Sequence, residues 1–305
     1  MNIAIVGCGF VADYYAVTLK NYSSLVVKGV YDIDKSRQQK FSKFYDFPQY
    51  ESFEDLLRDN STSIILNLTN PSSHYEVSLA CLKSGKHVYR EKPLAMDLGQ
   101  AKHLASLANE KGLQISSAPC SILSETAQTI WKAINDDVPG RINLVYAELD
   151  DGLVHKMRYK KWISASGAPW PYKDEFEVGC TLEHAGYYVT WLGAYFGCVK
   201  EVTSFAHCLI PDKETDVPLD IRSPDFSVAC IEFESGVIAR LTCSIIAPHD
   251  HSLKIFGNNG ILLTNECWKY RNPVYFKKLT KMALWAEKYP WLTRLLGLGP
   301  KKIPL

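Results

Sequence analysis

The first dozen residues constrain the fold of this chain more than any other feature of its sequence. An apolar run over residues 2–7 ends in Gly7, and Gly9 and Ala12 follow as a helix-like segment begins at residues 11–21. The first glycine of such a pattern permits a tight turn, the second lets the backbone approach a ligand, and the alanine lets the helix pack on the strand. The spacing G-x-G-x-x-A therefore predicts a strand, a turn and a helix through Gly7, Cys8, Gly9, Phe10, Val11 and Ala12.

Strand-like and helix-like segments alternate throughout residues 1–119. Short apolar runs predict strands at residues 2–7, 25–31, 64–68, 87–90 and 114–118. Helical patterns occur at residues 11–21, 34–45, 72–84 and 97–111, and Asp34 is a suitable N-cap for the second of them. Strands that alternate with helices pair in parallel through right-handed crossovers. We therefore predict an α/β domain with a doubly wound parallel sheet and helices on both of its faces.

The pattern changes near Pro119, and strands then follow one another with fewer helices between them. Helices are predicted at residues 122–135 and 182–196, and strands at residues 141–150, 198–210, 225–234, 237–246 and 252–256. Hairpin turn signals lie at residues 234–236 and 258–260, each ending in glycine. Successive strands joined by hairpins indicate an antiparallel sheet. We therefore predict an α+β domain over residues 120–268, followed by a tail over residues 269–305.

The charge balance narrows the classes of partner. The 305-residue chain has 34 Lys and Arg and 33 Asp and Glu residues, a formal net charge of +1. A nucleic-acid-binding domain usually has a basic excess or a basic stripe, so we expect no nucleic-acid partner. The average conceals an asymmetry, because residues 269–305 hold nine basic residues and one acidic residue, which leaves 25 basic and 32 acidic residues in the rest.

The cysteines and the N-terminus favour a reducing, cytoplasmic location. The nine cysteines are scattered and form no C-x-x-C pair, which indicates neither a secreted disulfide scaffold nor a zinc site. The apolar run at residues 3–12 is only ten residues long, has no basic segment before it and meets Asp13 directly. It is too short for a membrane span and lacks the features of a signal peptide.

The glycine pattern and an acidic residue after the second strand predict a Rossmann dinucleotide-binding domain over residues 1–119. The diphosphate of the cofactor is expected at the N-terminus of the first helix, where backbone N–H groups lack partners. Asp32 ends the second strand, where a carboxylate binds the hydroxyls of the adenosine ribose. Because this carboxylate would repel a 2′-phosphate, we expect NAD rather than NADP, although Arg37 lies nearby in the sequence. The alternative is a glycine-rich turn without a ligand.

Further motifs make the chain resemble the glucose–fructose oxidoreductase, inositol dehydrogenase and rhizopine catabolism (Gfo/Idh/MocA) family. The matching stretches are TNPSSH at 69–74, ACLKSGKHV at 80–88, EKPLA at 91–95, IEFESG at 231–236 and IFGNNG at 255–260. The resemblance covers about residues 1–267. It implies a Rossmann domain followed by a domain with a large, mostly antiparallel open sheet, which supplies substrate contacts and often the interface of a homo-oligomer. It also implies hydride transfer at a carbon of a sugar, polyol or nucleotide sugar.

The resemblance also implies roles for residues of the first domain. Thr69, Asn70 and His74 would line the ribose and diphosphate side of the cofactor, Glu91 would approach the nicotinamide ribose, and Lys92 would reach the reacting oxygen. A partly desolvated lysine beside a nicotinamide cation exchanges its proton closer to neutral pH, and in its charged form it stabilises a developing alkoxide. The alternative for Lys92 is an ordinary surface lysine at a strand end.

The second domain departs from the family pattern, in which a His follows an Asp by four residues. Aligned on Gly179, Glu183 takes the place of the Asp and Tyr187 that of the His, and two residues four apart share a helix face. Tyr187 can donate a proton to a ketone, and His184 is a rival for this catalytic role. The alternative is a stripe of core residues made by His184, Tyr187, Tyr188, Trp191, Leu192 and Tyr195. The core interpretation is favoured for His184 and is as good as the catalytic one for Tyr187.

Two further segments contain candidate binding residues. Residues 160–177 are rich in Trp, Pro and Lys, so Trp162 and Trp170 are candidates to stack on a sugar ring and Lys173 to meet an anionic substrate group. The equally good alternative is that the aromatic residues cover the seam between domains. His249-Asp250-His251 offers metal-ligand residue types without a third ligand at a supportive spacing, so we favour a turn and predict no metal.

The tail has a pattern of its own. Aromatic and aliphatic residues alternate with lysines over residues 275–296, which is compatible with an amphipathic element on a membrane surface or a partner. We favour packing against its own domain or another subunit, and Pro290 excludes one uninterrupted ideal helix.

Together these features predict a cytoplasmic NAD-dependent oxidoreductase that acts on a secondary alcohol or ketone of a sugar, polyol or nucleotide sugar. Its expected partners are a sugar-type small molecule and further copies of the chain. The alternative from another class is a non-catalytic, dinucleotide-sensing regulatory protein, because the family histidine is missing. Reduction of a linear tetrapyrrole fits the same fold but has no support in these residues.

Overall fold

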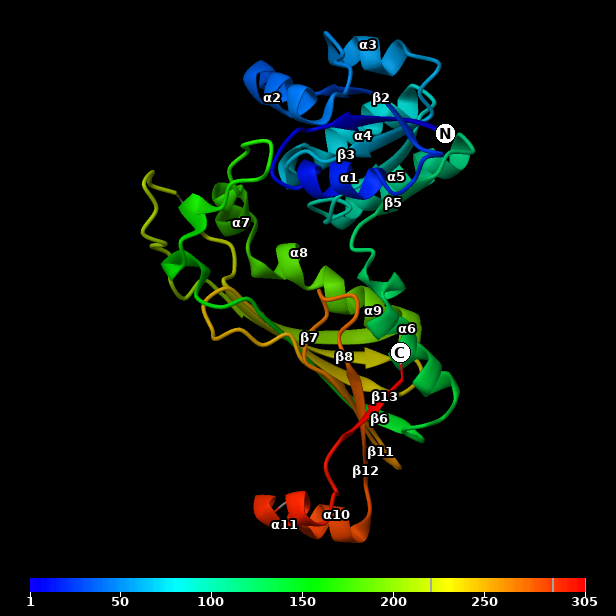
Figure 1. The fold of residues 1–305 in the computed structure, drawn as a ribbon, viewed down its shortest axis with the longest axis vertical. Coiled ribbons are helices and arrows are strands. Elements are labelled where there is room, and N and C mark those ends of the chain that lie inside the picture. Colours follow the sequence, from blue (N-terminus) through cyan, green and yellow to red (C-terminus); the bar gives the residue numbers. More distant parts are fainter. Residues whose placement is uncertain (220, 287, 305) are drawn as a thin grey trace. The chain divides into compact units, whose positions relative to one another are not determined.

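The computed structural model describes residues 1–219, 221–286 and 288–304 (Figure 1). The chain forms two compact units, each described here by itself. The first unit contains residues 1–118 and 157–178, and the second contains residues 119–156 and the rest of the described chain from residue 179 onward. The segment 157–178 therefore belongs to the first unit, although it follows the first strand of the second unit in the sequence.

Residues 1–118 form a five-stranded parallel sheet flanked by helices. The strands are β1 (Asn2–Val6), β2 (Val26–Tyr31), β3 (Ile64–Asn67), β4 (His87–Arg90) and β5 (Ile115–Ser117), in the spatial order β2-β1-β3-β4-β5. The helices are α1 (Ala12–Leu19), α2 (Lys35–Tyr45), α3 (Phe53–Arg58), α4 (His74–Lys83) and α5 (Leu98–Glu110), and a 3-10 turn η1 (Pro71–Ser73) precedes α4. The predicted doubly wound parallel sheet is confirmed, and α3 is an additional helix that was not predicted.

Alternating side chains of β1 show why helices cover both faces of this sheet. Ile3 and Ile5 belong to a buried cluster with residues of α1 and α2. Ala4 and Val6 point to the opposite face and join a second cluster with residues of α3, α4 and α5. Because successive side chains of a strand point to opposite faces, an unbroken apolar strand requires cover on both sides. The apolar run at the start of the sequence is therefore a consequence of its central position in the sheet.

The described residues of the second unit contain an eight-stranded sheet of order β13-β12-β11-β10-β6-β9-β8-β7. Its strands are β6 (Ile142–Asp150), β7 (Val199–His207), β8 (Phe226–Phe233), β9 (Ile238–Ser244), β10 (Leu253–Gly257), β11 (Gly260–Thr264), β12 (Val274–Lys278) and β13 (Lys301–Ile303). Its longer helices are α6 (Glu125–Asn135) and α9 (Gly186–Phe196), with shorter turns η2 (Ser121–Leu123) and η3 (Val154–Lys156). Among the described strands of this sheet, only β6 and β9 pair in parallel, so the predicted mostly antiparallel sheet is confirmed.

Two details of this unit differ from the sequence expectation. The predicted helix over residues 182–196 is two helices, α8 (Cys180–His184) and α9, which meet at Ala185. The tail was not expected to contain strands, yet β12 and β13 extend the sheet, and α10 (Lys281–Ala286) and α11 (Pro290–Leu295) lie between them in the sequence. Strand β12 forms because β11 offers it an open edge, a partner that local helical periodicity does not reveal.

For membrane-spanning segments, the property that can be examined in the structure is the length and apolar character of its helices. None of the helices within the described ranges combines the length and the apolar character needed to cross a membrane.

Pro290 is the first residue of α11. Proline is tolerated at this helix position because the N–H that it lacks would have no intrahelical partner.

Candidate functional site

The glycine turn between β1 and α1 has two glycines with different requirements. Gly7 has a φ of +94°, and a Cβ atom there would lie 2.6 Å from the backbone carbonyl of Leu68. A side chain at this position is therefore excluded by both conformation and space. A Cβ atom on Gly9 would meet no atom within 4 Å, so this glycine faces open space. Ala12 is fully buried where α1 packs on the sheet, as the pattern predicted.

A cavity of about 300 Å³ opens beside this turn. Three segments form most of its lining, namely the β1–α1 turn, the end of β2 with the following residues, and the loop between β3 and α4, and Phe53 and Val77 complete it. Its polar lining includes Asp32, Arg37, Thr69 and Asn70 together with the backbone of Gly7 and Gly9. All three segments follow the carboxyl ends of strands, which is where ligands bind in open α/β sheets.

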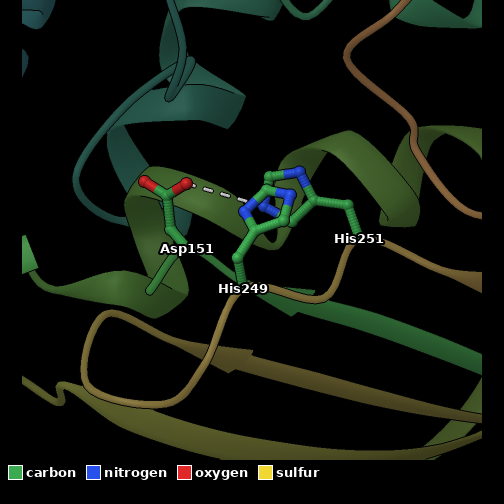
Figure 2. Close-up of side chains that lie close together, drawn as sticks. All are labelled: Asp151, His249 and His251. Carbon is green, nitrogen blue, oxygen red and sulfur yellow. Dashed lines mark ion pairs between the residues drawn. The ribbon is translucent and has the colours of Figure 1, made fainter. Parts of the chain in front are cut away.

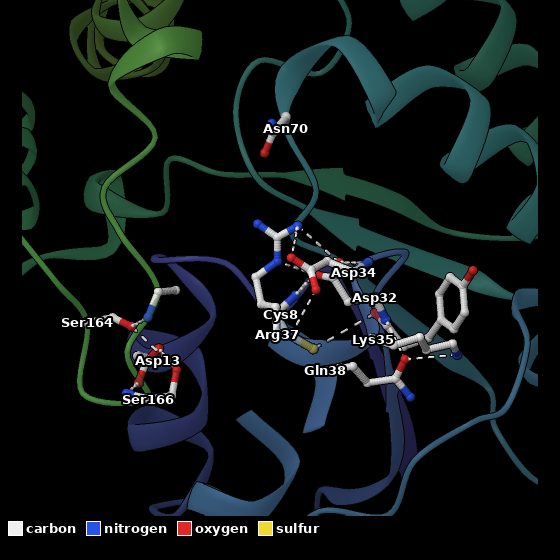
Figure 3. Close-up of polar contacts among 12 residues, drawn as sticks. Cys8, Asp13, Asp32, Asp34, Lys35, Arg37, Gln38, Asn70, Ser164 and Ser166 are labelled. Carbon is white, nitrogen blue, oxygen red and sulfur yellow. Dashed lines mark hydrogen bonds and ion pairs between the residues drawn. The ribbon is translucent and has the colours of Figure 1, made fainter. Parts of the chain in front are cut away.

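The Asp32 carboxylate joins the glycine turn to the start of α2 (Figure 3). One oxygen accepts the backbone N–H of Cys8 at 2.8 Å and the Nε–H of Arg37 at 3.1 Å. The other accepts the N–H of Asp34 at 2.8 Å and a second guanidinium N–H of Arg37 at 3.2 Å. Asp32 is buried, whereas Arg37 retains 38% of its side-chain surface and also lines the cavity.

These features fit a dinucleotide. The open space at Gly9 leaves room for a diphosphate against the backbone, and α1 begins directly afterwards. A buried carboxylate at the end of β2 stands where the adenosine ribose is held in this fold. The predicted residues Phe10 and Val11 lie in the turn itself, where Phe10 contacts the ring of Tyr14 on α1.

The loop after β3 contains two predicted cofactor residues, Thr69 and Asn70, and a third, His74, begins α4. The hydroxyl of Thr69 donates to Asn67 at 2.6 Å, and the amide of Asn70 donates to Asp174 at 2.8 Å. His74 is fully buried, and its two ring nitrogens lie 2.9 Å from the carbonyl oxygen of Thr69 and 3.0 Å from that of Pro93. His74 thus links two loops at the edge of the sheet and does not line the cavity.

The environment of His74 keeps its ring neutral. Burial, aided by the positive charge of Arg90, lowers the pKa of His74 to about 4. A neutral imidazole has one N–H, so only one of the two carbonyl oxygens receives a hydrogen bond from it. In this structure His74 contacts the carbonyls of Thr69 and Pro93, and its predicted role toward the cofactor stays a prediction.

Glu91 and Lys92 follow β4 directly. Glu91 accepts a hydrogen bond of 2.6 Å from the hydroxyl of Tyr15 on α1, and its other oxygen accepts the backbone N–H of Lys92 at 3.2 Å. Burial and the Glu91 carboxylate raise the pKa of Tyr15 far above its usual range, so Tyr15 remains a donor. Lys92 is half-buried and precedes Pro93 through a cis peptide bond. The sequence did not single out Tyr15, which orients the carboxylate.

The segment 157–178 is anchored on the nucleotide domain through Asp13, another residue that the sequence did not single out (Figure 3). The Asp13 carboxylate accepts the backbone N–H and the hydroxyl of Ser166, both at 2.8 Å, and the hydroxyl of Tyr45 at 2.8 Å. Ser166 lies 153 positions from Asp13, so no local signal could have paired them. Asp174 in α7 (Tyr172–Val178) meets Asn70 in the cavity lining.

The predicted substrate residues of this segment contact one another. The rings of Trp162 and Trp170 lie 4.9 Å apart in an edge-to-face arrangement, and Trp170 also contacts Tyr159 in the turn η4 (Tyr159–Lys161). Trp162 and Lys173 are exposed and Trp170 is half-buried. These residues belong to the first unit, not to the second domain in which the sequence interpretation placed them.

The remaining catalytic candidates lie in the second unit. Glu183 and His184 are buried in α8, and Tyr187 is half-buried in the first turn of α9. The rings of His184 and Tyr187 lie 6.0 and 5.4 Å from that of Trp268. Tyr188, Trp191 and Leu192 are fully buried, so most of the proposed core stripe is core. The structure thus groups Glu183, His184 and Tyr187 in one unit, while Lys92 belongs to the other.

Comparisons with known proteins agree with both halves of this architecture. Residues 1–118 match the family model described as an oxidoreductase family with an NAD-binding Rossmann fold, and residues 127–263 match the model of the GFO/IDH/MocA C-terminal domain. Among curated proteins, the trans-1,2-dihydrobenzene-1,2-diol dehydrogenase of Bos taurus is 24% identical over 270 residues, which cover 87% of this chain and 74% of the relative.

Two solved structures illustrate the similarity of fold. The 3-ketoreductase KijD10 of Actinomadura kijaniata, in complex with TDP-benzene and NADP, has a TM-score of 0.74 at 18% identity and covers 91% of this chain and 81% of its own. The WlbA dehydrogenase of Bordetella pertussis, in complex with NADH and UDP-GlcNAcA, has a TM-score of 0.73 at 18% identity and covers 87% and 78%. With its two family domains in this order, the chain belongs to the Gfo/Idh/MocA family of NAD(P)-dependent oxidoreductases.

Proposed function

We propose that this enzyme transfers a hydride between a nicotinamide dinucleotide and a secondary alcohol or ketone of a sugar, polyol or nucleotide sugar. The observation that carries the proposal is the position of Lys92, which follows β4 at the carboxyl edge of the parallel sheet. Strand β4 neighbours β3, and the loop after β3 lines the cavity. The names of the relatives, a diol dehydrogenase, a 3-ketoreductase and a dehydrogenase with bound UDP-GlcNAcA, support alcohol and ketone chemistry.

The cofactor is proposed to lie along the cavity. The turn from Gly7 to Ala12 and the N-terminus of α1 would hold the diphosphate, and Asp32 would bind the adenosine ribose. Thr69 and Asn70 would line the middle of the dinucleotide, and Glu91, oriented by Tyr15, would approach the nicotinamide ribose. NAD is the proposed cofactor, because a 2′-phosphate would meet the buried Asp32 carboxylate.

The chemistry divides between the cofactor and the protein. When bound, the nicotinamide accepts or donates the hydride. The Lys92 ammonium would stabilise negative charge on the substrate oxygen and exchange a proton with it. Glu183, Tyr187 and His184 of the second unit remain proposed catalytic residues, and Tyr187 is preferred as the proton donor because His184 is buried. Trp162, Trp170 and Lys173 remain proposed substrate contacts.

Replacement of Lys92 tests this assignment. With a substrate found by screening sugars and nucleotide sugars for NADH formation or consumption, Lys92→Ala should lower kcat by about 10²- to 10⁴-fold, the usual contribution of a positioned acid or base. The dissociation constant for NADH should change little. Lys43→Ala, an exposed lysine of α2, is the matched control. Undiminished turnover by Lys92→Ala would contradict the proposal.

The rival function is a non-catalytic sensor of the dinucleotide. It predicts binding of NAD without hydride transfer to any member of the substrate panel. Isotope exchange between deuterated substrate and NAD separates the two, because a sensor shows none.

The second unit is also proposed to mediate homo-oligomer formation through its open sheet. Strand β7 lies at the end of the sheet, and all nine of its residues are exposed, including Val202 and Phe205. An exposed apolar edge of this kind is a site for association. Light scattering with size-exclusion chromatography should show an oligomer that Phe205→Lys dissociates, and a wild-type monomer would refute this proposal.

A further inference from the structure

The second unit gathers two histidines and two carboxylates at the ends of three adjacent strands. Asp150 and Asp250 form an antiparallel bridge at the end of β6, with each backbone N–H donating to the carbonyl of the other at 2.9 Å. In this register, Asp151 lies opposite His249. Side chains opposite each other, and those two apart on one strand, project from the same face, so His251 joins them there.

The fourth residue comes from the next strand. Leu253 pairs with Thr264 in the β10–β11 ladder, and the continued register places Glu266 opposite His251. Their side chains meet, with His251 Nδ1 at 2.9 Å from a Glu266 oxygen. Residues 115 positions apart thus converge because β6, β10 and β11 are neighbours in the sheet.

Glu266 determines which nitrogen of His251 can bind a ligand. The same carboxylate oxygen also accepts the backbone N–H of Trp268 at 2.9 Å. A carboxylate only accepts hydrogen bonds, so Nδ1 of His251 carries a hydrogen and Nε2 is directed away from Glu266. The His251 side chain is 0% exposed, and no described residue forms a hydrogen bond with its Nε2. A metal ion that displaces the proton of Nε2 can bind this buried nitrogen, which pairs with an Asp151 oxygen at 3.6 Å. A carboxylate on the other nitrogen is the usual support of a metal-binding histidine.

Two further side chains with metal-binding atoms, those of Asp151 and His249, lie near this nitrogen. An Asp151 oxygen lies 3.6 Å from His251 Nε2, and the rings of His249 and His251 have their centroids 4.1 Å apart. Figure 2 shows the Asp151 carboxylate directed toward the two adjacent imidazole rings. One ligand atom from each of Asp151, His249 and His251 lies within 4.8 Å of the other two. The His249 side chain is 53% exposed, so the cluster reaches from the buried His251 to solvent.

We propose that Asp151, His249 and His251 bind a divalent transition-metal ion of the zinc class, with Glu266 orienting His251. Two imidazoles and a carboxylate are ligands that zinc and cobalt share, and the two carboxylates of the cluster balance the ion's charge. The Asp151 and His249 side chains retain 23% and 53% of their surface, so neither is locked in place by packing on all sides. The Trp268 ring contacts that of His251 at 4.3 Å and also those of Tyr187 and His184.

Metal titration tests the site without substrate or cofactor, so its outcome is independent of the proposed function. Tag-free protein, treated with a chelator and dialysed, is titrated with Zn²⁺ by calorimetry and with Co²⁺ by visible absorption. One ion per chain is expected, with absorption bands of tetrahedral or five-coordinate cobalt. His249→Ala and Asp151→Asn should each weaken Zn²⁺ binding at least about tenfold, and Glu266→Gln by about 10- to 100-fold through loss of orientation.

Two controls keep the test specific. His207→Ala removes an exposed histidine of the same unit and should leave binding unchanged. Cys267→Ser should also leave it unchanged, although Cys267 lies within ligand reach of His251 and Glu266. Cobalt should quench tryptophan fluorescence in the wild type and less in Trp268→Phe, which reports binding without relying on a buried variant. No stoichiometric binding, or equal binding by the His249→Ala and His207→Ala proteins, would overturn the proposal.

Discussion

Two buried aspartates, one in each unit, each pair with a basic side chain and accept hydrogen bonds from nearby backbone N–H groups, yet their surroundings give them different roles. Asp32 accepts the N–H groups of Cys8 and Asp34 and pairs with Arg37. Asp225 accepts those of Leu209 and Ile210 at 2.7 and 2.8 Å and pairs with Lys213 at 2.6 Å. Arg37 is 38% exposed beside a cavity, whereas Lys213 and Asp225 are 0% and 1% exposed.

The difference lies in the exposure of the cation. The sealed ion pair ties residues 209–213 to Asp225 and has no surface left for a ligand. A pair open on one side can exchange partners with a ligand at modest cost, because solvent already weakens it. An aspartate paired with a basic side chain thus stabilises the structure in the second unit and forms a candidate binding surface in the first.

The largest expected effect comes from breaking the sealed pair. Asp225→Asn leaves the Lys213 ammonium buried without a counter-charge, which should lower the free energy of unfolding by about 3–5 kcal/mol. Denaturation in urea, followed by circular dichroism, measures this change. Glu232→Gln, which breaks an exposed pair with Lys200, is the control and should cost less than about 1 kcal/mol. Equal effects of the two substitutions would refute the distinction between sealed and open pairs.

His74 extends the comparison to a buried ionisable group of the first unit. Its folded-state pKa of about 4 lies below the ordinary value of 6.5, so the unfolded chain binds more protons between these values. Stability should therefore be intact above pH 6.5 and fall by about 3 kcal/mol as the pH decreases toward 4. The difference in unfolding free energy between wild type and His74→Asn, measured across this range, isolates the contribution. If the difference in unfolding free energy between the two proteins did not change with pH, the proposed contribution of His74 would be contradicted.

The two glycines of the turn separate folding from binding within the first unit. Gly7→Ala should destabilise the protein by about 2 kcal/mol, because it combines a positive φ with a clash against Leu68. Gly9→Ala should leave stability nearly unchanged but weaken NADH binding, since its methyl group enters the space proposed for the diphosphate. Thermal unfolding and NADH fluorescence titration measure the two effects. Unimpaired NADH binding by the Gly9→Ala protein would contradict the proposed position of the diphosphate beside Gly9.

Asp32→Ser is the open-pair counterpart of the Asp225 substitution. It should cost little stability but release Arg37 to bind a 2′-phosphate, which lowers the ratio of the NADPH to the NADH dissociation constant by about tenfold, or about 1.4 kcal/mol. Titrations with both reduced cofactors provide the ratio. If Asp32→Ser lost stability as Asp225→Asn does and left the ratio unaltered, the comparison would fail.

The smallest expected effect concerns the segment anchored on Asp13. Ser166→Ala removes one hydrogen bond to a buried carboxylate and should cost about 1 kcal/mol, because the backbone N–H of residue 166 still binds Asp13. Ser106→Ala removes a comparable hydroxyl–carboxylate bond on the exposed surface of α5 and should have almost no effect. Urea denaturation of the two variants provides the comparison, and indistinguishable midpoints would contradict the anchoring role.

Local patterns in the sequence determined the nucleotide-binding half. Gly7, Gly9, Ala12 and Asp32 all belong to one β1–α1–β2 unit, whose geometry is set by steric limits on short turns and by parallel strand pairing. The positions of Lys92 and Glu91 at a strand end were also predictable, because an apolar run stops directly before them.

Only the tertiary structure decided which distant residues meet. Asp13 binds Ser166, the tail adds β12 to the edge of β11, and Asp151 reaches the histidines at 249 and 251. The physical reason is that strand order and register in the second sheet depend on the burial of whole faces, not on local spacing. The sequence alone therefore predicted a turn at His249-Asp250-His251, and three neighbouring strands make it a candidate metal site.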